Sequence, residues 1–211
     1  MKIISINVAQ PETRVYFGKE TQTGGHKQAV PQARLTYTNF EGDGQADLKN
    51  HGGPNKAVCV YSFDHYPHWE EVFGVSLLPG AFSENLTIAG LQEAEVCLGD
   101  VFRIGDEVRV QISQPRQPCS KLVGKHNRKD LPDLIHANSW SGFYLRVLQA
   151  GVVRAGDAAE RVERHPLGVT VEFANQVMYR QRADYASLER VLAVDALSIE
   201  WQKSLSRRLT S

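Results

Sequence analysis

The first 160 residues of the chain consist mainly of short apolar segments that alternate with clusters of turn-forming residues. The segment 106–113 is the clearest, because Val108, Val110 and Ile112 alternate with polar residues at the period of two that a half-buried strand shows. Further segments of this kind lie at 3–8, 33–38, 56–61, 143–148 and 151–154. Many short strands separated by glycine- and proline-containing turns predict a mainly β fold, either a barrel or a sandwich.

Helical patterns interrupt the strands and then replace them after Pro166. Within the β region, one helix is expected in 64–73, ending at Gly74, and a second in 131–137. Three helices are expected after Pro166, at 171–180, 184–194 and 198–209, with apolar stripes at helical spacing. Isolated helices of this length are marginally stable. We therefore expect them to pack on each other and on the β region, with a boundary near 161–166.

Composition and charge exclude several classes of protein. The 211 residues include 24 Lys and Arg and 24 Asp and Glu, so the formal net charge is zero. Nucleic-acid-binding proteins usually carry a basic excess, so no nucleic-acid partner is expected. No apolar run approaches the roughly 20 residues of a membrane span, and the first residues lack the apolar part of a secretory signal. We therefore expect no membrane partner and a cytoplasmic location.

Cys119 has the most unusual surroundings of the three cysteines. The segment 109–129 contains six basic residues and no acidic residue. Basic neighbours stabilise the thiolate, which attacks electrophiles and binds metals, and they favour an anionic ligand such as a phosphate ester. The alternative is an inert thiol in a solvated basic loop. Cys59 and Cys97 lie in apolar segments and are expected to be buried.

Three loops add backbone and amide groups that suit ligand binding. His51-Gly52-Gly53-Pro54 and Thr23-Gly24-Gly25-His26-Lys27 are tight glycine loops next to a lysine, where backbone N–H groups can approach an anion. The segment 79–86 places Asn85 at a turn, where its amide can bind a heterocycle. Ordinary turns are the alternative for all three. No zinc-ligand spacing is present, so His65 and His68 are expected on the surface.

The motifs taken together resemble those of the MOSC-domain family, the molybdenum cofactor sulfurase C-terminal domain family, in its YiiM type, which is linked to 6-N-hydroxylaminopurine resistance. The resemblance rests on six motifs in order: 23–27, 42–47, 51–57, 79–86, 98–100 and 113–119. It covers about residues 1–160, and the tail after 165 resembles the 3-alpha domain of that type. The resemblance implies a MOSC β-barrel over 1–162 and a small three-helix domain over 163–211.

The resemblance also implies a ligand and the residues that hold it. The ligand is the molybdenum cofactor, a pterin with a dithiolene and a phosphate, and Cys119 is the expected metal ligand and catalytic residue. Lys27, Lys56 and Arg116 are assigned to the phosphate. Asn85 and the loop residues His51, Gly52 and Gly53 are assigned to the pterin.

One departure from the family pattern affects a ligand loop. Ser83 stands where the family usually has glycine. If that position requires a positive φ, serine costs on the order of 1 kcal/mol.

The implied activity is the reduction of N-hydroxylated compounds, such as hydroxylaminopurine-type base analogues, to amines, which is a detoxification. The chain shows no flavin or nicotinamide fingerprint, so a separate flavoprotein-type reductase is expected as the electron donor. His51 and a metal-bound water are the two candidates for the proton donor. The alternative is a cofactor or sulfur carrier in which Cys119 bears a persulfide. A third reading, a cysteine nucleophile paired with His126, requires the two side chains to be within hydrogen-bond reach.

Overall fold

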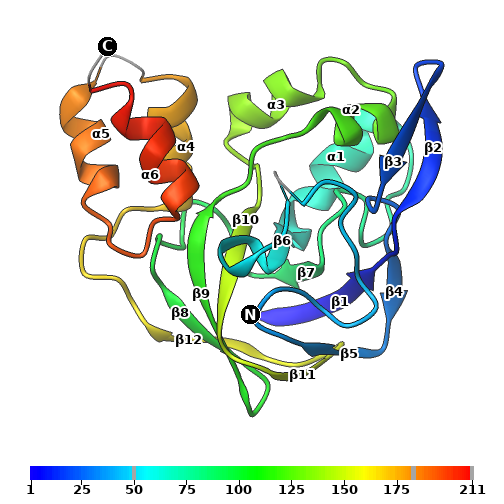
Figure 1. The fold of residues 1–211 in the computed structure, drawn as a ribbon, viewed down its shortest axis with the longest axis horizontal. Helices are drawn as coiled ribbons and strands as arrows, with labels where there is room; N and C mark the ends of the chain where they lie inside the picture. The colour runs from blue at the N-terminus through cyan, green and yellow to red at the C-terminus, as the bar shows by residue number, and fades with distance from the viewer. Residues whose placement is uncertain (49–50, 182–183, 210–211) are drawn as a thin grey trace.

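An eight-stranded mixed sheet forms the centre of the computed structural model, which describes residues 1–48, 51–181 and 184–209 (Figure 1). The strand order is β12-β8-β9-β10-β6-β7-β1-β4. β6 and β7 pair in parallel, and the other neighbours pair antiparallel. The strands are β1 (Lys2–Val8), β4 (Gln28–Val30), β6 (Val58–Ser62), β7 (Leu86–Ala89), β8 (Val101–Ile104), β9 (Val108–Pro115), β10 (Phe143–Gln149) and β12 (Ala159–Glu163).

The two edge strands of the sheet, β12 and β4, share no ladder within the described residues. The start of β1 nevertheless comes beside the residues that precede β12. Lys2 forms a bridge with Ala158, and the Ile3 N–H donates to the Asp157 carbonyl at 2.9 Å. The structure confirms a mainly β fold. Because the described residues of β12 and β4 form no ladder with each other, closure of the sheet into a barrel stays a prediction.

Two small sheets accompany the large one. β5 (Gln32–Leu35) pairs with β11 (Gly151–Arg154), and β2 (Glu12–Tyr16) pairs with β3 (Lys19–Thr23). The β2–β3 hairpin turns at Phe17 and Gly18, which both have positive φ, as a two-residue hairpin turn requires. β3 ends at Thr23, where the first predicted glycine loop begins.

The core confirms the alternation seen in the sequence. Val108, Val110 and Ile112 of β9 are fully buried, and they belong to one apolar cluster that continues from the sheet into the C-terminal helices. A second, mainly aromatic cluster includes Trp69 and Phe82 and lies under the helices of the β region.

Three helices lie beside one end of the sheet: α1 (Tyr66–Phe73), α2 (Ser120–His126) and α3 (Leu131–Asn138) (Figure 1). α1 ends at Gly74 in the left-handed conformation, as predicted. α3 confirms the second predicted helix. α2 was not predicted, and it begins directly after Cys119.

The C-terminal segment forms the three predicted helices, α4 (Val171–Tyr179), α5 (Tyr185–Leu192) and α6 (Ile199–Ser206), which group together beside the sheet (Figure 1). Each has a side-chain N-cap, from Thr170, Asp184 and Ser198 respectively. Their buried residues join the core of the sheet rather than forming a core of their own. None of the helices in the described parts of the chain is long and apolar enough to cross a membrane.

Candidate functional site

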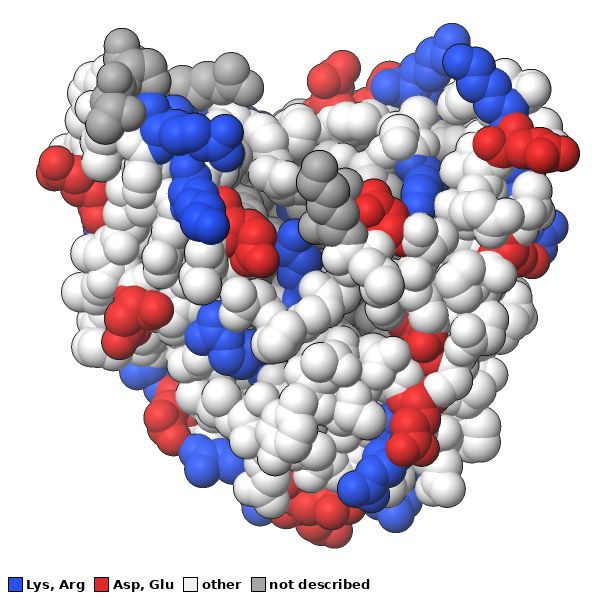
Figure 2. All heavy atoms as spheres, viewed as in Figure 1, with Lys and Arg blue, Asp and Glu red and all other residues white. Residues whose placement is uncertain are grey.

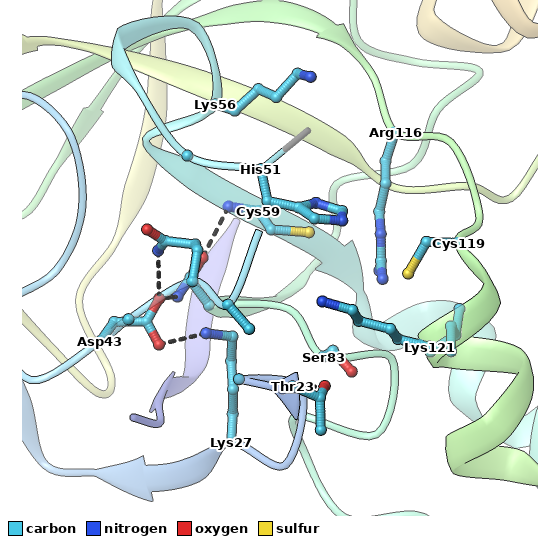
Figure 3. A pocket seen from close by; sticks show the side chains of 18 of the residues that line it. Thr23, Lys27, Asp43, His51, Lys56, Cys59, Ser83, Arg116, Cys119 and Lys121 are labelled. Carbon is cyan, nitrogen blue, oxygen red and sulfur yellow. Dashed lines mark hydrogen bonds and ion pairs between the residues drawn. The ribbon is translucent and has the colours of Figure 1, made fainter. Parts of the chain in front are cut away.

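A pocket with about 630 Å³ of space between its walls, part of it open to solvent, lies where three loops meet the end of β9 (Figure 3). It brings together segments that are far apart in the chain. Its lining includes seven of the eight residues assigned from the sequence: Lys27, His51, Gly52, Lys56, Asn85, Arg116 and Cys119. Gly53 does not line it. Gly53 is exposed and precedes the short 3₁₀ helix Pro54–Lys56.

Cys119 occupies the N-cap position of α2 and lines the pocket with its half-buried thiol. Burial by itself raises the pKa of this thiol. A hydrogen bond from His51 and the positive charge of Arg116 outweigh that effect and lower the pKa to about 6. The sulfur is therefore mostly a thiolate at neutral pH, as the basic segment predicted.

Arg116 supplies a buried positive charge close to the Cys119 sulfur. Only 5% of the residue is exposed, and its guanidinium points toward the space between His51 and Cys119 (Figure 3). Within residues 1–48, 51–181 and 184–209, no hydrogen bond or ion pair is formed by this guanidinium. Its N–H donors are thus left without hydrogen-bond acceptors among the described residues, so the geometry suits an anionic ligand that accepts from them.

Lys121 adds a second basic group, and its ammonium also points into the pocket (Figure 3). As for Arg116, the described part of the chain provides no ion-pair partner for it. Arg116 and Lys121, which lie on the two sides of Cys119 in the sequence, thus join Lys56 in giving the pocket its basic character.

Lys27 is held differently, because it forms a buried ion pair with Asp43. The same carboxylate accepts hydrogen bonds from the Ala9 N–H at 2.9 Å and from the Asn85 amide at 2.9 Å. The side-chain oxygen of Asn85 in turn accepts a hydrogen bond from the Cys59 N–H at 3.1 Å. Asp43 and Asn85 therefore fix the floor of the pocket, and much of the Asn85 amide is used inside the protein.

The loop after Gly52 is fixed through Asn55. The Asn55 side-chain oxygen accepts from Arg146 at 2.7 Å, and its main-chain carbonyl accepts from the Ser113 hydroxyl at 2.5 Å. At the start of this loop, the His51 ring lies 3.5 Å from the Tyr144 hydroxyl. His51 thus stands between Tyr144 and Cys119.

Ser83 lines the pocket with φ at +61°. The position therefore does require the left-handed conformation that glycine adopts without strain. The glycines of the neighbouring loop are also needed for space. A Cβ on Gly24 would lie 2.3 Å from the Gly44 carbonyl oxygen, and one on Gly25 would lie 2.9 Å from the Ser83 hydroxyl.

Several pocket residues were missed by sequence reasoning: Thr23, Asp43, Cys59, Lys121 and Tyr144. Asp43 and Thr23 lie inside two of the motifs that carry the family resemblance, which was the available signal. Cys59 is buried as expected, yet its sulfur points into the pocket (Figure 3). Tyr144 gave no signal, because its role depends on pairing between strands distant in sequence.

Two histidine predictions are corrected by the structure. His65 is not on the surface: it is 1% exposed, bonded to Glu93 at 2.7 Å and stacked on Trp140. His126 bonds the Ala81 carbonyl at 2.9 Å and stacks on Phe73, outside the pocket that Cys119 lines. A Cys119–His126 nucleophile pair is therefore wrong for this arrangement.

Comparisons with known proteins agree with the motifs. A profile of the MOSC domain matches residues 47–160, and a profile of the YiiM-like 3-alpha helix domain matches residues 169–211. The chain is 47% identical over 207 residues to YflK of Bacillus subtilis (strain 168), covering 98% of this chain and 93% of that protein. It is 36% identical over 180 residues to Protein YiiM of Escherichia coli (strain K12), covering 84% and 80% respectively. The crystal structure of YiiM from Geobacillus stearothermophilus has a TM-score of 0.84 at 36% identity and covers 99% of this chain and 98% of that one.

Proposed function

This chain belongs to the MOSC-domain family, in the branch that carries a YiiM-like 3-alpha helix domain, and on that premise we propose that it binds the molybdenum cofactor and reduces N-hydroxylated compounds to amines. Hydroxylaminopurine-type base analogues are the proposed substrates. The observation that carries the proposal is a thiolate-forming cysteine beside a buried arginine that has no partner among the described residues.

The residues of the pocket fit such a group. A thiolate is a soft ligand suited to the metal, and the partnerless Arg116 guanidinium provides donors for a phosphate. A Cβ on Gly24 would meet the Gly44 carbonyl and one on Gly52 would meet the Gln45 side chain, so glycine at these positions lets the pocket loops pack closely on each other.

Cys119 is proposed to hold the metal, with Arg116 and Lys56 binding the phosphate. Lys121, which the sequence assignment omitted, joins them because its ammonium points into the same space. His51 and Gly52 are proposed to contact the pterin. Lys27 and Asn85 take part mainly by fixing the pocket floor, since Asp43 binds both of them.

When bound, the cofactor supplies the two-electron chemistry that no amino-acid side chain provides. The N–O bond of R–NHOH breaks, and two electrons with two protons give R–NH₂ and water. The protein binds and orients the substrate and the cofactor. We propose that the electrons come from a separate flavoprotein-type reductase.

Metal content tests the binding part of the proposal. Protein is purified anaerobically from a host that makes the cofactor, and molybdenum is measured by elemental analysis. Wild type and the Cys97→Ala control are expected to hold molybdenum near one per chain, because Cys97 lies outside the pocket. Cys119→Ser is expected to hold little. Equal molybdenum in all three would contradict the role of Cys119.

Turnover tests the activity separately. The loaded protein is supplied with an N-hydroxylated purine and a chemical reductant, and the amine is measured by chromatography. Amine formation that disappears in Cys119→Ser supports the reductase. Molybdenum binding without turnover would instead support the carrier function, in which the Cys119 sulfur stores or transfers cofactor or sulfur.

A further inference from the structure

A second hollow adjoins the pocket described above and shares Cys119 with it. It is lined by residues of the β9–α2 connection and of β10, and it shares five residues with the first pocket: His51, Lys56, Cys119, Lys121 and Tyr144. Its space is about 750 Å³, part of it open to solvent. The two hollows meet at Cys119, so a ligand in one reaches the same sulfur as a ligand in the other.

Two glutamine carboxamides distinguish the second hollow from the first. Gln114 and Gln117 line the second hollow only. Gln117 is exposed, and its carboxamide forms no hydrogen bond within the described residues. Gln114 is buried at the end of β9. The hollow therefore offers amide donors and acceptors beside the charged groups of Lys56, Lys121 and Asp47.

The C-terminal helices hold Gln114 in one orientation. The Ser198 hydroxyl donates to the Gln114 Oε1 at 2.6 Å, and the Ser198 N–H donates to the Ser113 carbonyl at 2.9 Å. The Gln114 Nε2 donates to the Pro115 carbonyl at 3.2 Å. The Pro115 carbonyl can only accept, so it identifies Nε2 as the nitrogen, and the Ser198 hydroxyl on Oε1 adds a second bond that keeps the carboxamide in this orientation.

The carboxamide retains one N–H donor and one oxygen lone pair after these bonds. A donor and an acceptor side by side match the edge that adenine presents with its ring nitrogen N7 and its exocyclic amino group. An oxopurine presents two acceptors on that edge and requires two donors. A fixed carboxamide therefore discriminates between the two.

We infer that this second hollow is the substrate site, and that Gln114, held by Ser198 of the helical region, recognises the amino-substituted edge of a purine-like heterocycle. The inference rests on the proposed function for the chemistry that follows binding. It gives the helical region a role in specificity, with Ser198 as a positioning residue. Figure 2 shows the surface hollowed between the helical region and the rest of the molecule.

Binding of two unreactive purines to the cofactor-loaded protein tests the inference. Calorimetric titration with adenine, the amine product of the proposed reaction, is compared with titration by hypoxanthine. Wild type is expected to bind adenine about tenfold more tightly, which is the discrimination of one good bidentate pair. Equal affinities, or tighter binding of hypoxanthine, would overturn the inference.

Two substitutions test the roles of the named residues. Gln114→Glu keeps an oxygen for Ser198 but loses the N–H donor, so adenine affinity is expected to fall about tenfold. Ser198→Ala removes the bond that holds Oε1 and leaves the carboxamide held only by Pro115, so the ratio of adenine to hypoxanthine affinity is expected to fall below the wild-type value. An unchanged ratio in Ser198→Ala would remove the positioning role.

Ser198 also caps α6, so a control must remove a cap without touching the hollow. Thr170→Ala does this for α4, and Thr170 lies outside both hollows. Its affinity ratio is expected to stay at the wild-type value. If the ratio of adenine to hypoxanthine affinity falls in Thr170→Ala as well, the fall in Ser198→Ala comes from loosening of the helical region and not from the Ser198–Gln114 bond. A protein that discriminates adenine but reduces no N-hydroxylated purine would keep this site and contradict the proposed function.

Discussion

The Lys27 ammonium and the Asp43 carboxylate form an ion pair at the floor of the pocket, where their side chains are 7% and 1% exposed. Asp43 also binds the Ala9 N–H and the Asn85 amide, so the pair connects β1, the loop after β3 and the strand β7 region. The charge of Lys27 is therefore largely used within the protein. Arg116, Lys121 and Lys56 are the other basic residues of the pocket, and they provide the positive charge for a ligand.

Replacing Asp43 by asparagine is expected to destabilise the fold, because it leaves the Lys27 charge buried without a carboxylate. Breaking one side of a buried pair typically costs about 3–5 kcal/mol, and the opening of the pocket places this case near the lower value, about 3 kcal/mol. Urea unfolding of the cofactor-free protein measures the loss. A change below about 1 kcal/mol would show that the ion pair does little for stability.

The matched control removes both charges. Lys27→Met combined with Asp43→Asn leaves no unpaired buried charge, so the double variant is expected to be more stable than the sum of the single losses predicts. Strict additivity would mean that the two side chains do not interact.

The reactivity of Cys119 is expected to change near pH 6. The folded protein lowers the pKa of this thiol to about 6 from its ordinary value of 9.0. Alkylation by iodoacetamide requires the thiolate, so the rate falls as pH drops below 6 and reaches a plateau above it. Mass spectrometry of the cofactor-free protein locates the label, and burial, which raises the pKa of Cys59 and of Cys97, keeps these two from competing.

Removing the His51 hydrogen bond is the matching control for that titration. His51→Ala is expected to move the midpoint toward higher pH, because the largest effect that lowers the Cys119 pKa is lost. A wild-type midpoint near 9, or a midpoint that does not respond to His51→Ala, would refute this account of the thiol.

The local parts of the fold followed from the sequence, while α2 did not. The β9 alternation and the Gly74 end of α1 depend on neighbouring residues, which a sequence pattern records. α2 is short, lacks a side-chain cap and contains Gly124. It is held by tertiary contacts, with Leu122 buried and the Tyr16 ring lying against Gly124. Such contacts leave no local signal.

The same distinction applies to the site. Cys119 and Arg116 stand three residues apart in a basic segment and could be predicted together. The partners of the histidines could not, since His65 meets Glu93 and His51 meets Tyr144 across long stretches of chain. His65 can be buried because the Glu93 carboxylate, which is distant in sequence, bonds its ring. The residue type of His65 and its neighbours in sequence give no information about that partner.

Ser83→Gly is expected to stabilise the protein. Ser83 has φ at +61°, where a Cβ costs about 1 kcal/mol, and glycine removes that strain at the price of some unfolded-state entropy. The free energy of unfolding is expected to rise by roughly 0.5 kcal/mol in urea denaturation. Ser83→Ala keeps the Cβ and serves as the control, with no gain expected. A gain in the alanine variant would assign the effect to the hydroxyl instead.

Gly124→Ala is expected to destabilise, which reverses the usual effect of this substitution in a helix. Alanine normally stabilises a helix interior by about 1 kcal/mol relative to glycine. Here a Cβ would lie 2.4 Å from the Tyr16 ring, so the β2–β3 hairpin cannot keep its position on α2. Loss of the Tyr16–His26 hydrogen bond, 2.7 Å in the structure, is expected to follow. Limited proteolysis is expected to cut the hairpin faster in this variant.

A second substitution separates the steric conflict from helix propensity. Tyr16→Ala removes the ring, so adding Gly124→Ala on that background is expected to stabilise the protein, by up to about 1 kcal/mol. The sign of the Gly124→Ala effect therefore depends on whether Tyr16 is present. Destabilisation on both backgrounds would mean that α2 needs glycine for a reason other than the hairpin, and urea unfolding of the four proteins decides between these outcomes.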